Sequence, residues 1–251
     1  VPFDGIYSLI ARLWQPDSIL EIDEKNYLSF SPRLIRFGSS GLAGVWAEEN
    51  TRESIYNAFR RKETFGTSGP RIKVRFFAGY NFENSNLNDQ DLIQEAYSKN
   101  IPMGGDIIQE KGKNPRFLVW AISDPLGAPL QRVQIIKGWL ADGEQREKVF
   151  DVACSDGQSV NPLNHRCPDN GAKVNLDDCS ISREKGNAEI KTFWQDPEFS
   201  NDQEAFYYAR VLENPTCRWS TWDAVRAEEK PRSDIPVTIQ ERAWSSPIWI
   251  K

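Results

Sequence analysis

Histidine is almost absent: the 251 residues include one, His165, in a polar stretch. Catalytic zinc centres usually take several His ligands, and a Ser-His or Cys-His nucleophile pair needs a well-placed imidazole. The chain therefore cannot supply a multi-histidine metal site. We predict no catalytic residue, no metal ligand and no cofactor within it.

Long apolar runs and an excess of basic residues are also missing. No apolar run approaches the roughly 18 residues needed to cross a membrane, which predicts no membrane span. The formal net charge is -5, whereas a general nucleic-acid binder needs a basic face for phosphates. There is no initiator Met and no signal sequence. We therefore expect Val1 to begin a processed, trimmed or proteolysed chain.

Cysteine is scarce, and none of the four residues (Cys154, Cys167, Cys179 and Cys217) forms a CxxC pair, which argues against structural zinc. We predict two disulfides and hence a periplasmic or secreted protein. Four reduced, buried thiols are the alternative. Three connectivities exist, and sequence alone does not choose among them. Loop entropy favours the local pair Cys167–Cys179, which leaves Cys154 with Cys217.

The chain is otherwise rich in core-forming residues, with 39% hydrophobic and 12% aromatic side chains. Such a composition is typical of a folded protein. The stretch Gly41–Phe77 reads as a helix followed by a strand. Asn50 or Thr51 suits an N-cap, and Glu53 stands three residues after Asn50, as in a capping box.

Two periodicities in this stretch identify its elements. Helical spacing predicts a buried stripe of Ile55, Ala58 and Phe59. After the breaker at residues 67–70, apolar residues from Ile72 to Phe76 alternate with basic ones, which predicts a strand. The change from helical to strand periodicity marks the predicted domain boundary.

Most of the remaining chain has a β pattern interrupted by turn residues. Short helices are predicted at residues 89–99 and 219–226. Strands are predicted at residues 116–123, 131–140, 145–153, 188–194, 205–212 and 237–244. Strands at this spacing indicate an antiparallel sandwich. Residues 6–13 suggest a short helix and residues 27–37 interrupted strand pieces, so residues 1–40 are either torn from a larger domain or an irregular extension.

Four separated motifs occur in order: residues 41–77 (GLAGVWAEEN to KVRFF), FLVWAISDPLGAPLQRVQIIKGWL, AFYYARVLENPTCRWSTWDAVR and TIQERAWSSPIWI. Together they resemble the C-terminal part of a large bacterial family catalogued as domain of unknown function 3604. The resemblance covers nearly all of residues 38–251. The N-terminal part of that family resembles the polymerase-and-histidinol-phosphatase (PHP) metal-dependent hydrolases.

The resemblance implies an α+β, mainly β chain. Residues 1–68 would be closing helix and strand elements of a PHP-like barrel, and residues 69–251 an antiparallel β-sandwich-like accessory domain. The His-x-His and Asp-x-His motifs of such a barrel have no counterpart here. A divalent metal would therefore belong to the full-length parent. The implied partner is the missing N-terminal portion, and a homo-oligomer is a further expectation.

Two polar clusters are candidate contacts for a substrate pocket or an anion. One opens the predicted helix and the other lies at the domain junction. They are Glu48, Glu49, Thr51 and Arg52 in the first, and Thr67, Ser68 and Arg71 in the second. A helix N-terminus beside an Arg suits a phosphate or sulfate ester. Ordinary helix capping and surface ion pairs are the alternative.

Paired tryptophans supply a different kind of candidate. CRWSTWD contains Trp219 and Trp222, and WSSPIW contains Trp244 and Trp249. They either stack on carbohydrate or pack between domains.

The sequence leads to two hypotheses for the function of the chain. It is either the non-catalytic C-terminal portion of a secreted phosphoester or sulfoester hydrolase, or a module that binds a glycan or a partner subunit.

Overall fold

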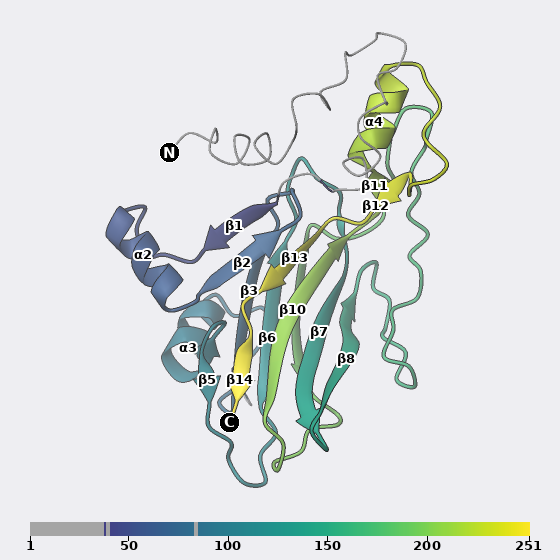
Figure 1. Cartoon of the computed structure of the whole chain (residues 1–251). Coiled ribbons are helices and arrows are strands. Elements are labelled where there is room, and N and C mark those ends of the chain that lie inside the picture. Colours follow the sequence, from purple (N-terminus) through teal and green to yellow (C-terminus); the bar gives the residue numbers. More distant parts are fainter. Residues whose placement is uncertain (1–37, 39–40, 83–84) are drawn as a thin grey trace.

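The computed structural model describes residues 38, 41–82 and 85–251. The elements predicted at residues 6–13 and 27–37 lie outside the described residues. Within them the chain is mainly β, as predicted (Figure 1). The other predicted helices and strands have counterparts, but the strand predicted at residues 237–244 is divided into Thr238–Ile239 and Arg242–Ser245. The strands at Leu42–Val45, Thr64–Thr67 and Ile248–Ile250 were not predicted.

The first half of the described chain contains, in order, β1 (Leu42–Val45), α2 (Arg52–Arg60), β2 (Thr64–Thr67), β3 (Lys73–Gly79), α3 (Leu92–Lys99), β4 (Ile101–Pro102), β5 (Asp106–Ile107) and β6 (Arg116–Ile122). The second half contains β7 (Leu130–Ala141), β8 (Glu144–Cys154), β9 (Glu189–Gln195), β10 (Ala205–Glu213), β11 (Thr216–Cys217), α4 (Trp219–Arg226), β12 (Thr238–Ile239), β13 (Arg242–Ser245) and β14 (Ile248–Ile250).

The larger sheet is built around β10. On one edge β10 pairs antiparallel with β7, which forms a hairpin with β8 through the turn at Asp142-Gly143. On the other edge β13 and β14 pair with successive parts of β10. From there β13 leads to β2 and β1, and β14 pairs in parallel with β5.

The smaller sheet has the order β4-β3-β6-β9, all antiparallel. Alternate residues of both sheets fill one shared core, in which Phe117 lies 4.7 Å from Tyr207 between ring centroids. The two sheets therefore form a sandwich. The outer face of the smaller sheet has its own apolar cluster, where Leu92 and Ala96 of α3 pack on Phe77 and Leu118.

Helix α2 begins one residue later than a capping box at Asn50 requires. Thr51 is the N-cap, and its Oγ1 accepts a hydrogen bond from the backbone N of Ser54 (3.2 Å). The predicted stripe is partly wrong. Ala58 is buried, but the side chain of Phe59 is 51% exposed because this short helix packs along β1 through a narrow face.

The structure confirms two disulfides but corrects their pairing. Cys154 is bonded to Cys167, and Cys179 to Cys217. The preferred pair Cys167–Cys179 failed because Cys154–Cys167 closes a loop of nearly the same length. The pairing is instead set by local geometry. Cys167 N donates to Asp151 Oδ2 (2.7 Å), and this hydrogen bond holds Cys167 beside the end of β8, where Cys154 lies.

The larger sheet continues across the boundary predicted at residue 68. Ala43 pairs with Gly66, and Gly66 in turn pairs with Trp244. Residues on both sides of the boundary thus share one hydrogen-bonded sheet. The assignment of residues 1–68 to a PHP-like barrel stays a prediction.

Candidate functional site

The larger sheet carries a cavity with an aromatic floor, where β7, β8, β10 and β14 meet. The cavity has a volume of about 810 Å³. Phe206 and Trp249 lie directly opposite each other on β10 and β14, with ring centroids 4.9 Å apart. Trp249 is 42% exposed, and Leu140 of β7 adds to the apolar wall, whereas the side chain of Trp139 packs against the core between the sheets. We call this site the aromatic cavity.

A glycine positions the floor of the aromatic cavity. Gly138 pairs with Phe206, and a Cβ on Gly138 would stand 2.3 Å from the ring atom Cζ of Phe206. The absent side chain lets the phenyl ring lie flat over the backbone of β7. The ring of Phe206 is also nearly parallel to that of Tyr208, at an interplanar angle of 13°.

Charged side chains form the rim of the aromatic cavity. The exposed residues Glu147, Asp202 and Glu204 bring carboxylates, and Arg146 brings a cation. Burial raises the pKa of Tyr208, and the charge of Glu147 adds to that effect. An apolar floor with acceptors around it suits a ligand that has both C–H faces and hydroxyl groups.

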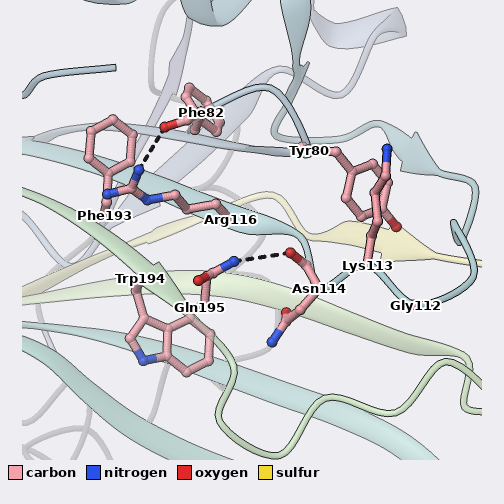
Figure 2. Close-up of a pocket in the computed structure, with 10 residues that line it drawn as sticks. Tyr80, Phe82, Gly112, Lys113, Asn114, Arg116, Phe193, Trp194 and Gln195 are labelled. Carbon is pink, nitrogen blue, oxygen red and sulfur yellow. Dashed lines mark hydrogen bonds between the residues drawn. The ribbon is translucent and has the colours of Figure 1, made fainter. Parts of the chain in front are cut away.

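A second, more polar pocket of about 600 Å³ lies where strands of the smaller sheet end (Figure 2). Gly79, Arg116 and Gln195 stand side by side there, because each pairs with the next across β3, β6 and β9. Figure 2 shows Tyr80 and Lys113 on one side of this strand-end pocket and Phe193 and Trp194 on the other.

Hydrogen bonds hold the polar groups of the strand-end pocket in place. Arg116 Nη1 donates to Phe82 O (2.6 Å), and its guanidinium carbon lies 4.1 Å from the ring centroid of Phe193. Gln195 Nε2 donates to Asn114 O (3.1 Å). Asn114 Oδ1 is buried without a partner among the described residues. A ligand donor could satisfy that oxygen.

The described residues contain no group of three or more His, Cys, Asp and Glu side chains arranged to hold a metal ion. Within the same residues, no helix has the length and apolar character needed to cross a membrane. The two disulfides are consistent with an oxidising compartment.

The first predicted cluster forms the cap of α2. Glu48, Glu49 and Arg52 are exposed, and Glu49 N donates to Ser54 Oγ (3.2 Å). With Thr51 as the N-cap, these contacts are those of helix capping. Neither of the two cavities includes these residues.

The second predicted cluster lies at the opposite end of the β1–β2 pair, since Thr67 is opposite Leu42 and Thr64 opposite Val45. Thr67 is buried and accepts from Gly69 N (3.3 Å). Ser68 is hydrogen-bonded to Glu241, and Arg71 N donates to Asp124 Oδ2 (2.7 Å). The structure therefore does not bring the two predicted clusters together.

Of the paired tryptophans, Trp249 lines the aromatic cavity. Trp219 and Trp222 belong to α4, at the other end of the molecule beside β11 and β12 (Figure 1). Sequence reasoning missed Phe206, Arg116 and Asn114. The signal for Phe206 was its alternation with core residues along β10, which places it on the outer face.

The fold is thus a disulfide-bonded antiparallel β-sandwich with cavities at its sheet ends. The chain matches the family described as "Protein of unknown function (DUF3604)" over residues 15–251, and it belongs to that family. A comparison with curated proteins found no match, and a comparison with solved structures found none either.

Proposed function

We propose that this part of the protein is a non-catalytic module that binds a carbohydrate in the aromatic cavity. The observation that carries the proposal is the exposed Trp249 ring packed on the half-buried Phe206 ring, beneath a rim of carboxylates. Aromatic faces pack on the C–H faces of sugars, while carboxylates accept from hydroxyl groups. The cavity volume falls within the range of ligand pockets.

A panel of soluble oligosaccharides, titrated calorimetrically against the full chain, tests this proposal. Trp249→Ala should weaken binding of any oligosaccharide that binds by roughly five- to thirtyfold, since one stacked ring contributes on the order of 1–2 kcal/mol. Trp222→Ala is the matched control, because Trp222 is similarly exposed (37%) but lies on α4. Equal losses in both variants would contradict the proposal.

The resemblance supports a second part of the proposal: the module serves a periplasmic or secreted PHP-like metal-dependent hydrolase of phosphoesters or sulfoesters. The metal ligands would lie outside this chain, in an N-terminal portion that is the proposed partner, and a homo-oligomer remains a proposal. This chain alone should hydrolyse no aryl phosphate or aryl sulfate above background with Mg²⁺, Mn²⁺ or Zn²⁺. Turnover by this chain would contradict that assignment.

A further inference from the structure

The outer face of the smaller sheet carries a row of cations beyond the end covered by α3. Arg75 of β3 pairs with Trp120 of β6, and Trp120 pairs with Lys191 of β9. Lys73 lies two residues before Arg75, so strand alternation puts it on the same face. We call Lys73, Arg75 and Lys191 the basic row.

Tryptophan rings hold two of these cations in position. The guanidinium carbon of Arg75 lies 3.6 Å from the ring centroid of Trp46, and its Nη1 donates to Tyr97 OH (2.7 Å). Lys191 Nζ lies 4.2 Å from the ring centroid of Trp120. Such cation–π contacts fix a charge without neutralising it.

The basic row has little opposing charge. Among the described residues, no carboxylate lies within ion-pair distance of Lys73 or Arg75, and Lys191 has Glu189 at 3.5 Å. Glu189 also accepts from Trp120 Nε1 (2.6 Å). The hydroxyl of Tyr97 also donates to the buried carboxylate of Glu63, so Arg75 reaches that charge only through Tyr97. Three cations with one direct ion pair stand out in a chain of net charge -5.

Two cations of the basic row, Lys73 and Arg75, line a small cavity of about 220 Å³ together with Trp46, Trp120 and Ile122. Lys191 lies beside the cavity, over the ring of Trp120. The charged groups that line the cavity are donors only. Because cations already occupy a face of each indole, the cavity favours a compact anionic group over a stacked planar base. A guanidinium fork suits the oxygens of a sulfate or carboxylate.

We propose that this cavity binds the anionic group of an acidic polysaccharide, either a sulfate ester or a uronate carboxylate. The site lies on a different sheet from the aromatic cavity. Each site can therefore fail its test without affecting the other. Charge complementarity and the fixed guanidinium support this ligand class.

Dextran sulfate and a polyuronate, with neutral dextran as reference, are the probes for an experiment on the full chain. The wild type should bind one of the acidic polymers, with an affinity that falls steeply as salt rises. Lys73→Gln combined with Lys191→Gln should weaken this binding at least tenfold and flatten its salt dependence. Which acidic polymer binds distinguishes sulfate from carboxylate.

The matched control is Lys173→Gln combined with Lys230→Gln, which removes the same charge from exposed positions elsewhere. This control should change the affinity less than twofold, and both double variants should keep the wild-type far-UV spectrum. No binding of either acidic polymer, equal loss in both double variants, or tighter binding of single-stranded DNA or anionic vesicles would overturn the proposal.

Discussion

At the residue scale, the core contains a buried ion pair between Lys137 and Asp196. Lys137 Nζ lies 2.6 Å from Asp196 Oδ2, and the side chains are 3% and 0% exposed. Tyr207 OH donates to the same carboxylate (2.7 Å), and Lys137 also donates to Glu198 O (2.9 Å). Burial and Asp196 raise the pKa of Tyr207. Both charges are buried, but each takes part in at least two hydrogen bonds, which offsets their desolvation.

Lys137→Met should lower the free energy of unfolding by about 3–5 kcal/mol, because Asp196 would stay buried without its cation. Urea unfolding followed by tryptophan fluorescence measures this loss. Lys137→Met combined with Asp196→Leu should be less destabilising than Lys137→Met alone. A loss below about 1 kcal/mol in the single variant would contradict the role given to this pair.

Glu213 is a buried acid, and no cation lies within ion-pair distance of it among the described residues. Its Oε2 accepts from Ala128 N (3.2 Å), while Oε1 has no partner among the described residues. Burial, with smaller contributions from Glu241 and Asp124, raises the pKa of Glu213 to about 8. Glu213 is therefore protonated in the folded chain at neutral pH.

This raised pKa predicts a pH-dependent stability. Because the folded pKa exceeds the ordinary value of 4.5, the stabilising contribution is complete below pH 4.5 and is lost as pH rises through about 8. Glu213→Gln should remove a change in the free energy of unfolding on the order of 5 kcal/mol over this range. Denaturant unfolding at several pH values measures it, and the exposed Glu229→Gln is the control. An unchanged slope in Glu213→Gln would contradict the buried acid.

At the element scale, the disulfides fasten a long polar connection that has few strands of its own. The sequence separation is 13 residues for Cys154–Cys167 and 38 for Cys179–Cys217. Loop entropy predicts that replacing both cysteines of a pair by Ser costs about 3 kcal/mol for the first and about 4 kcal/mol for the second. Thermal unfolding of the two double variants should give that order, and the reverse order would contradict it.

Gly138 offers a test of the aromatic cavity that keeps every aromatic residue. Gly138→Ala should displace the Phe206 ring and weaken oligosaccharide binding several-fold, because the new Cβ would stand 2.3 Å from Phe206 Cζ. The control is Gly66→Ala, since a Cβ there meets only Leu42 O at 3.8 Å. Calorimetric titration of both variants checks this, and unchanged affinity in Gly138→Ala would contradict the geometry.

Local patterns predicted the elements better than the site. The strand over residues 205–212 and the helix over residues 219–226 were evident from periodicity and agree with β10 and α4. The disulfide pairing was not evident from the sequence, because it depends on the hydrogen bond between Cys167 N and Asp151 rather than on loop length. The aromatic cavity was only partly foreseen, since it joins the β7–β8 hairpin to β10 and β14, which lie far from that hairpin in sequence.

At the scale of the whole molecule, the described chain forms one sandwich with a site on each sheet. Leu42–Val45 and Thr64–Thr67 extend the larger sheet. The helix and strand that suggested a domain seam therefore also belong to the sandwich within the described residues. Neutral and acidic carbohydrate groups would contact different sheets: the aromatic cavity the larger, the basic row the smaller.

The most direct test is a nuclear magnetic resonance titration of the full chain with its tryptophan indoles labelled with ¹⁵N. As an oligosaccharide from the panel is added, the indole signal of Trp249 should shift and saturate. The signals of Trp219 and Trp222 should stay unchanged. Saturable shifts confined to α4, or no shift with any oligosaccharide of the panel, would contradict carbohydrate binding in the aromatic cavity.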